Sequence, residues 1–161
     1  MKVIINLSLL FTISLLAFLG YTSGMTVDRS SKSSGYISIE ELYNSCHVPG
    51  SCGKKMDCEG EIARVKGYVD YENVFDKRNY PQLPYEKFKI YDKRGQSVEV
   101  WTVSDDNNKI FEKIYQNKIS PEKMAFIEGT IIGFDMPAMG VCRRSIKMNI
   151  DKESDIFFEQ Q

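Results

Sequence analysis

The sequence predicts a mainly β protein: a small five-stranded barrel with one capping α-helix, preceded by a short N-terminal helix and a Cys-rich loop. Two segments, 63–69 and 125–131, share a layout in which a small residue, a β-branched residue, glycine and a β-branched residue face one way. A glycine inside a strand marks a bend or a close backbone approach, and closing a small barrel requires such bends. A strand hairpin and a helix pattern lie between the two segments. This architecture serves binding more often than catalysis.

The N-terminal segment, 1–24, has the features of an export signal. Lys2 gives a positive start, 3–19 is largely apolar, and small residues end at Gly24, after which we expect cleavage. The apolar run is at the short edge for spanning a bilayer, so an uncleaved membrane anchor is the alternative. The Ser-rich residues that follow, 25–37, have no apolar periodicity and are expected to form a flexible spacer. The predicted location is extracytoplasmic, either periplasmic or secreted.

Size and charge limit the remaining possibilities. The chain has 161 residues, with 21 basic and 22 acidic side chains. The part after residue 24 is large enough for one domain with a single core. A protein built to coat polyanions usually carries a clear positive excess, so the near-balance argues against nucleic acid and leaves only local patches to consider.

Four cysteines, Cys46, Cys52, Cys58 and Cys142, follow the export segment. An even number of cysteines in an exported chain indicates disulfides. Zinc ligands usually come in pairs two to four residues apart, whereas these cysteines are more widely spaced and His47 directly adjoins Cys46. Free or redox-active thiols remain an alternative, although the chain has no Cys-x-x-Cys motif. We therefore expect disulfides, no metal and no cofactor.

Local patterns place the secondary structure. Ser38 and Glu41 have the spacing of a capping box, which predicts a helix through Tyr43 or Asn44 that leads into the Cys-rich loop, together 38–60. The barrel is expected over 61–150, and the tail 151–161 is expected to pack its Ile156–Phe158 segment as an edge. The barrel elements, in order, are a strand 61–71, a connection 72–86, strands 87–92 and 96–103, a helix 107–117, a strand 123–134, a loop 136–140 and a strand 142–150.

Alternation within the strands predicts which side chains face inward. In the second strand Phe88 and Ile90 face one way, while Lys87, Lys89 and Tyr91 face the other. The helix at 107–117 carries one apolar stripe and should close an open end of the barrel. The other predicted inward residues are Val98, Val100 and Thr102 in the third strand and Ile146, Met148 and Ile150 in the last; the helix stripe is Ile110, Phe111, Ile114 and Tyr115.

Three runs carry a resemblance to a known fold: Val65–Val69, Phe88–Gly95 and Ile127–Ile131. Together with the strand, loop, hairpin, helix and strand order, 61–150 resembles the OB-fold, and most closely its anticodon-binding type among nucleic-acid-binding domains. The resemblance implies a ligand face on the second and third strands, flanked by the loops after the first and fourth. Exported OB domains also include a haem chaperone family with a haem-binding histidine near the C-terminal end of its barrel, but His47 precedes the barrel here, so no haem role is expected.

The resemblance also narrows the disulfide pairing. In such barrels the first strand pairs antiparallel with the fourth, and the fourth with the fifth. The start of the first strand should therefore lie near the start of the fifth. This implies that Cys142 bonds to Cys58 or to Cys52, and that the two remaining cysteines close a short loop.

The first functional hypothesis is an exported, non-catalytic binding module for a protein or a cell-envelope polymer. Met adapts to irregular partner surfaces, and Tyr adds amphipathic contact area. The residues expected to contribute are Met136, Met139, Tyr71, Tyr80 and Tyr85. The alternative is that these side chains only cap the barrel ends.

The second hypothesis is single-strand nucleic-acid binding, in which aromatic residues stack bases and cations follow phosphates. Lys87, Lys89, Tyr91 and Trp101 would form this surface, although Glu99 lies in its middle. Lys93, Arg94, Arg143, Arg144 and Lys147 could extend it. The alternative is a solvated strand face with Trp101 packed under the helix.

An enzyme is the third hypothesis and is not expected. The chain has one histidine, His47, and it lies in the Cys-rich loop, so no Ser-His-Asp triad is expected. The chain has no Gly-rich phosphate loop and no interpretable pair of carboxylates. Glu59 and Glu61, on either side of Gly60, are better explained as solvated charges at a strand start. No catalytic residue is therefore predicted.

Overall fold

The computed structural model describes residues 35–103, 107–138 and 140–160. The predicted export segment, most of the predicted spacer and Met139 lie outside these ranges. The elements are helix α1 (Ile39–Cys46), strands β1 (Ile62–Phe75), β2 (Glu86–Tyr91) and β3 (Ser97–Thr102), helix α2 (Asn107–Gln116), strands β4 (Met124–Ala138) and β5 (Val141–Ile150), the 3-10 turn η2 (Glu153–Asp155) and strand β6 (Ile156–Phe158).

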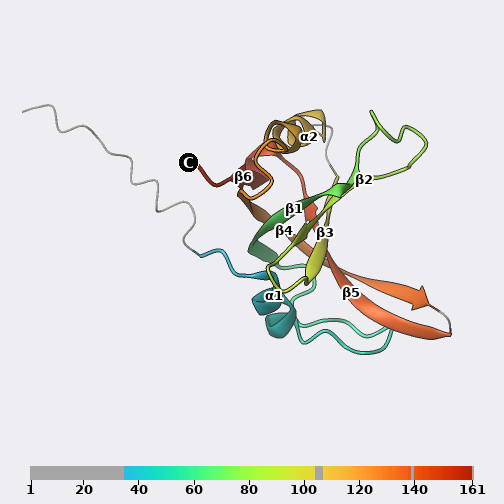
Figure 1. The fold of residues 1–161 in the computed structure, drawn as a ribbon. Coiled ribbons are helices and arrows are strands. Elements are labelled where there is room, and N and C mark those ends of the chain that lie inside the picture. The colour runs from blue at the N-terminus through green and yellow to red at the C-terminus, as the bar shows by residue number, and fades with distance from the viewer. Residues whose placement is uncertain (1–34, 104–106, 139, 161) are drawn as a thin grey trace, which may run out of the picture. The chain divides into compact units, whose positions relative to one another are not determined.

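Five of the strands close into a ring (Figure 1). β1 pairs antiparallel with β2 and with β4, β2 pairs antiparallel with β3, and β4 pairs antiparallel with β5. The ring is completed by β3 and β5, which run parallel. The predicted fold class, a mainly β five-stranded barrel with one capping helix after a short N-terminal helix, is thereby confirmed. The predicted edge segment is also present, because β6 pairs with β4.

Glycines allow the strands to cross closely where β1 and β4 pair. Ala63 lies opposite Gly129, and Gly67 lies opposite Ala125. A Cβ at Gly129 would stand 2.6 Å from the Asn149 carbonyl oxygen, and one at Gly67 would stand 3.0 Å from that of Tyr91. Both contacts are with backbone, so a side chain at either position would force the strands apart. The close backbone approach predicted at these two glycines is therefore present.

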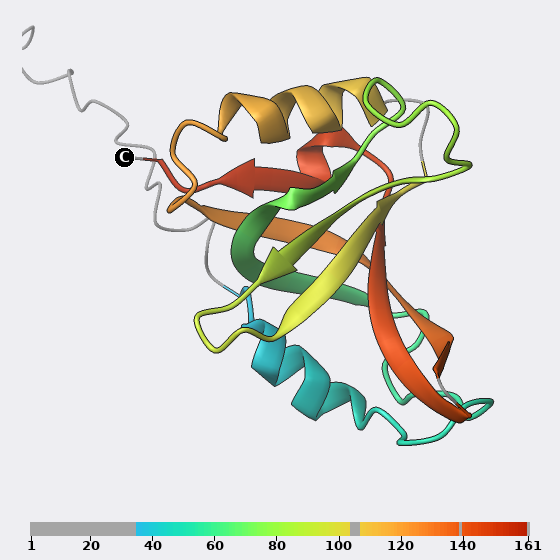
Figure 2. The ribbon, with the colours of Figure 1, turned by 45° about the vertical axis from the view of Figure 1, so that its right-hand side comes forward.

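The core fills the ring, and a helix closes each of its ends (Figure 2). The inward-facing residues predicted in β2, β3 and β5 are buried, and so are Ile110, Phe111 and Ile114 of α2. At the other end α1 buries Ile39, Leu42 and Cys46. Its predicted capping box forms, since Ser38 Oγ accepts from the Glu41 backbone N–H and Glu41 accepts from the Ser38 N–H.

Three predicted boundaries were wrong. α1 continues to Cys46, past the expected end at Tyr43 or Asn44, because Cys46 is bonded into the core. β1 continues past residue 71 to Phe75, into the expected connection 72–86. The expected loop 136–140 is largely strand, because β4 runs to Ala138 and pairs with β5 through Pro137 and Cys142. β4 has a single strand partner there, and proline is tolerated in an edge strand.

The chain enters the barrel through the last two residues of the predicted spacer. Ile37 forms a parallel bridge with Val65, donating to the Arg64 carbonyl and accepting from the Lys66 N–H, both at 2.9 Å. The Tyr36 ring packs edge-on against Phe126 and Phe157, whose rings stack at 4.8 Å. Of the helices within the described ranges, none has the length and apolar character of a membrane-spanning segment.

Candidate ligand-binding face

Four aromatic side chains gather with three charged ones on the outer surface of β2, β3 and β5. We call this group the aromatic patch: Phe75, Tyr80, Tyr85, Trp101, Lys87, Glu99 and Lys147. The Tyr85 and Trp101 ring centroids are 4.8 Å apart, and those of Phe75 and Tyr80 are 5.1 Å apart. The Lys87 ammonium lies between 5.4 and 5.7 Å from the rings of Phe75, Tyr85 and Trp101.

Glu99 fixes the centre of the aromatic patch. Its Oε1 accepts from the Lys87 ammonium at 2.7 Å, and its Oε2 accepts from the Trp101 indole N–H at 3.0 Å. Burial pushes the pKa of Glu99 upward, but these two hydrogen bonds and the charges of Lys87 and Lys89 outweigh it and lower the pKa. The carboxylate is therefore ionised at neutral pH and holds both the lysine and the indole in place.

Lys147 lies on the opposite side of Trp101 from β2. It is directly opposite Glu99 in the β3–β5 pairing, and its ammonium lies 3.8 Å from the Trp101 ring centroid. Burial lowers the pKa of Lys147, and the nearby charge of Lys87 adds to this, while Glu99 opposes it. Tyr85, which directly precedes β2, and Lys147 of β5 both contact the indole.

The connection from β1 to β2 supplies part of the aromatic patch and is held by two buried carboxylates. Asp76 accepts from the Asn79 backbone N–H at 3.0 Å and from Arg78 Nε at 3.2 Å. Glu86 accepts from the Lys77 backbone N–H at 2.9 Å and from the Asn107 side chain at the start of α2. Buried polar groups stabilise a fold only when they are hydrogen-bonded in this way.

The outer surface of the patch continues along a two-stranded ribbon formed by residues 131–138 of β4 and 141–148 of β5. Residues directly opposite each other in paired strands share a face. The register pairs Ile132 with Lys147, Phe134 with Ser145, and Met136 with Arg143. We use the term outer face for the aromatic patch together with these residues. The two surfaces predicted separately, on the strands and near Met136, thus belong to one face.

The opposite surface of the ribbon is covered by the Cys-rich loop. Cys52 is bonded to Cys142, and Cys46 is bonded to Cys58. Arg144 donates to both oxygens of Glu59, at 3.0 and 2.8 Å, and to Asp135 at 3.0 Å. These contacts hold the ribbon on one side. On its outer side, the Tyr43 side chain of α1 reaches Ser145, and its hydroxyl donates to the Ser97 carbonyl at 3.1 Å. The two disulfides confirm the expectation that all four cysteines are bonded. Of the two expected partners of Cys142, Cys52 is the one that bonds to it.

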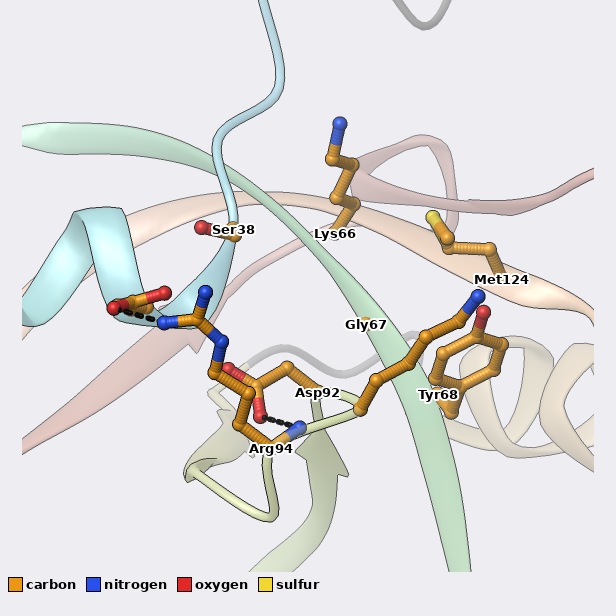
Figure 3. A pocket seen from close by; sticks show the side chains of 9 residues that line it. Ser38, Lys66, Gly67, Tyr68, Asp92, Arg94 and Met124 are labelled. Atoms are coloured by element: carbon orange, nitrogen blue, oxygen red, sulfur yellow. Dashed lines mark hydrogen bonds and ion pairs between the residues drawn. The ribbon is translucent and has the colours of Figure 1, made fainter.

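A separate pocket of about 200 Å³ lies at the β2–β3 hairpin. Figure 3 shows Lys66, Tyr68 and Arg94 around it, with Gly67 beneath. Arg94 pairs with Glu40 of α1, and Asp92 accepts from backbone N–H groups of the hairpin. This pocket lies at the far end of β2 from Lys87 and Trp101.

The predicted site residues divide between these places. Tyr80, Tyr85, Lys87 and Trp101 lie together in the aromatic patch. Lys89 lies on the same side of β2, between Asp70 and Glu99 in the register.

The other predicted residues lie elsewhere. Tyr91, 40% exposed, packs against Tyr68 beside the hairpin pocket. Tyr71 packs partly buried against the core, and burial raises its pKa. Met136 is exposed on the ribbon. Lys93 lines the hairpin pocket, and Arg144 lies on the covered side of the ribbon.

Several residues of the outer face were not predicted as ligand contacts. Phe75 was assigned to a connection, and Ile132 and Phe134 were counted only as strand residues. The expected loop at 136–140 hid the ribbon, so its alternating pattern was not read as an exposed surface. If the strand pattern of β4 is continued to Met136, Ile132, Phe134 and Met136 fall on one side of the strand, which predicts the exposed surface.

The only histidine of the chain, His47, lies in the Cys-rich loop beside Asp57. His47 Nδ1 lies 3.1 Å from an Asp57 oxygen, and both side chains are largely exposed. Across the described ranges, no three His, Cys, Asp or Glu side chains are grouped so as to hold a metal ion. The two disulfides indicate an oxidising, extracytoplasmic environment.

Comparison with known proteins gives no family assignment. No family model matches the chain, and no curated protein matches it. One similar solved structure is "OBody NL8 bound to hen egg-white lysozyme", with 18% identity and a TM-score of 0.40 over 62% of this chain and 96% of that chain. Another is a DUF3299 family protein from Pseudomonas aeruginosa PAO1, with 12% identity and a TM-score of 0.35 over 76% and 83% of the two chains. Both likenesses are too low to assign this chain to a family.

Proposed function

We propose that this chain is an exported, non-catalytic binding module of the OB superfamily that binds a protein or an envelope polymer on its outer face. The observation that carries the proposal is the preassembled aromatic patch, in which Glu99 holds Lys87 and Trp101 by hydrogen bonds of 2.7 and 3.0 Å. Rigid aromatic side chains reduce the entropy lost on binding. The strand order of the ring and the two disulfides support the family and the exported location, respectively.

Retention of envelope material on the immobilised protein tests this proposal. Tyr80 and Tyr91 form a matched pair, since they are the same residue type and are 37% and 40% exposed. Tyr80→Ala and Met136→Ala should each reduce retention of a specific protein or polymer, whereas Tyr91→Ala should leave it unchanged. Equal retention by all three variants and the unaltered chain would remove the outer face as the binding surface.

Single-stranded nucleic acid is the second candidate. It is favoured by the cations Lys87, Lys89 and Lys147 around a single glutamate in the aromatic patch. Stacking of bases requires an accessible ring, and Tyr85 and Lys147 both contact the Trp101 ring. Oligonucleotide titrations at low ionic strength decide this candidate, because the absence of binding there would eliminate it.

A further inference from the structure

Charge is distributed unevenly over this nearly neutral chain. The sequence as a whole has 21 basic and 22 acidic residues. Lys89 and Asp70 adjoin the outer face on β2 and β1. The outer face itself, by contrast, carries three cations, Lys87, Lys147 and Arg143, against Glu99. Such a local excess attracts anionic partners even when the net charge of the protein does not.

Two of these cations have no carboxylate partner. Both oxygens of Glu99 already accept hydrogen bonds, from Lys87 and from Trp101. Among the described residues, no carboxylate lies within ion-pair distance of Lys147 or Arg143. Burial and the charge of Lys87 lower the pKa of Lys147, so an arriving anion would favour its charged form. Lys147 and Arg143 are therefore available to pair with the anionic groups of a ligand.

The arrangement of the cations limits the kind of anion. Lys147 and Arg143 are four residues apart on the same side of β5, which corresponds to about 13 Å. Between them lie Ser145, which the Tyr43 side chain of α1 reaches, and its partner Phe134, with Ile132 beside Lys147. The face thus alternates cationic positions with apolar ones. This alternation fits a polymer whose acidic groups are separated by neutral units with an apolar surface.

The strand pairing argues against an extended peptide over the aromatic patch. A peptide that adds a strand needs an unpaired strand edge, but β2 pairs with β1 and β3, and β3 pairs with β2 and β5. The patch offers side chains only. Tyr85 and Lys147 already contact the Trp101 ring, at 4.8 and 3.8 Å from its centroid, so a stacking base would compete with both.

We propose that the ligand is an acidic glycan, whose acidic groups pair with Lys147 and Arg143 while its sugar rings pack on Tyr80, Tyr85 and Phe134. This inference rests on the proposed function and specifies its ligand class. Lys147 and Arg143 determine charge specificity, and the aromatic side chains supply contact area.

The test uses the full chain after the export segment and two acidic probes, an oligohexuronate and a sugar-phosphate oligomer. The control ligand is the same oligohexuronate with its carboxyl groups reduced to alcohols. Lys147→Gln and Arg143→Gln remove one cation each. Lys118→Gln is the matched control, because Lys118 is exposed at the end of α2, away from the outer face. Calorimetry measures affinity, and near-ultraviolet circular dichroism checks that each variant is folded.

We expect at least one acidic probe to bind, the reduced oligosaccharide to bind at least tenfold more weakly, and each Gln substitution on the face to weaken binding about tenfold. Lys118→Gln should bind as the unaltered chain does. Equal binding of the acidic and reduced oligosaccharides, or no effect of either substitution on the face, overturns the acidic-glycan inference but leaves the proposed function in place. The inference is also overturned if neither acidic probe binds, or if an oligonucleotide of equal charge binds more tightly. The proposed function fails separately, by the envelope-retention comparison of Tyr80→Ala with Tyr91→Ala.

Discussion

The two ends of this barrel are closed by different chemistry. At the α1 end, the Cys52–Cys142 disulfide and the ion pairs of Arg144 fasten the Cys-rich loop to the ribbon, and the Cys46–Cys58 disulfide fastens α1 to the loop. At the α2 end, the connection between β1 and β2 is held by hydrogen bonds to Asp76 and Glu86 and by contacts with α2. Both disulfides of the described residues lie at the α1 end. One end is therefore covalently fixed, and the other depends on buried polar groups.

This difference divides the outer face into two halves. The aromatic patch takes Phe75, Tyr80 and Tyr85 from the hydrogen-bonded end. The ribbon half, with Met136 and Arg143, depends on the disulfide end. Agents that break one kind of fastening should therefore disturb one half of the face before the other. Four changes, from the largest expected effect to the smallest, test this contrast.

The largest effect is expected from removing the Cys52–Cys142 disulfide. This bond joins residues 90 apart, whereas Cys46–Cys58 joins residues 12 apart. In the chain-entropy model, replacing Cys52 and Cys142 by Ala should lower the free energy of unfolding by about 4–5 kcal/mol, and replacing Cys46 and Cys58 by about 3 kcal/mol plus a packing loss. Urea unfolding under oxidising conditions measures both. A negligible loss for the Cys52 and Cys142 variant would contradict a covalently fixed ribbon.

Glu86→Ala should produce the next largest loss, at the opposite end. Glu86 is only 4% exposed, and its removal leaves the Lys77 N–H and the Asn107 amide without their acceptor. We expect a loss of about 2–3 kcal/mol in the free energy of unfolding, with a change in the Trp101 fluorescence. Glu86→Gln, which keeps one acceptor oxygen, is the control and should cost less. If the Trp101 signal stays native in a folded Glu86→Ala variant, the patch does not depend on this network.

Gly133→Ala should loosen the ribbon without touching a disulfide. A Cβ there would stand 2.4 Å from the Arg144 guanidinium, so the guanidinium must shift, which disturbs its hydrogen bonds to Glu59 and Asp135. The expected loss is about 1–2 kcal/mol, the scale of charge-assisted hydrogen bonds. Arg144→Gln serves as the companion variant, and the double variant should lose little more than either one. Fully additive losses would show that Gly133 and Arg144 act independently.

The smallest effect concerns pH. The hydrogen bond from Arg144, together with one from the Met56 N–H and the charges of Arg144 and Lys55, outweighs the opposing effect of burial and lowers the pKa of Glu59. A lowered carboxyl pKa adds stability that is present above the unfolded-state value of about 4.3 and is lost as the pH falls through the folded-state value. Glu59→Gln should therefore show a flatter decline in stability below about pH 4. If stability falls with pH equally in Glu59→Gln and in the unaltered chain, the Glu59 carboxylate does not contribute to acid stability.

Much of the fold could be predicted from the sequence, because local patterns specify it. Alternation placed Phe88, Val100 and Met148 inward, and the repeated glycines identified the two crossing strands. The disulfide partner of Cys142 remained open between Cys58 and Cys52. Both lie in the same loop, and sequence spacing does not reveal which one the ribbon reaches.

The ligand face was less predictable, because it depends on register. Met136 and Arg143 lie next to each other only because β4 continues to Ala138, and a loop had been expected from Pro137 and Gly140. Tyr91 and Trp101 share the outward side of the hairpin but lie at its opposite ends. Alternation gives the side of a strand and not which residues lie together along it, so Tyr91 and Trp101 could not be separated in advance.

The central claim is that the outer face, and not the hairpin pocket, binds the ligand. Titration of the isotope-labelled protein with the acidic oligosaccharide, followed by backbone and indole N–H chemical shifts, tests it most directly. The account predicts perturbations at the Trp101 indole N–H, at Glu99 and Lys147, and along the ribbon to Arg143. Perturbations confined to Lys66, Tyr68 and Lys93 around the hairpin pocket would contradict it.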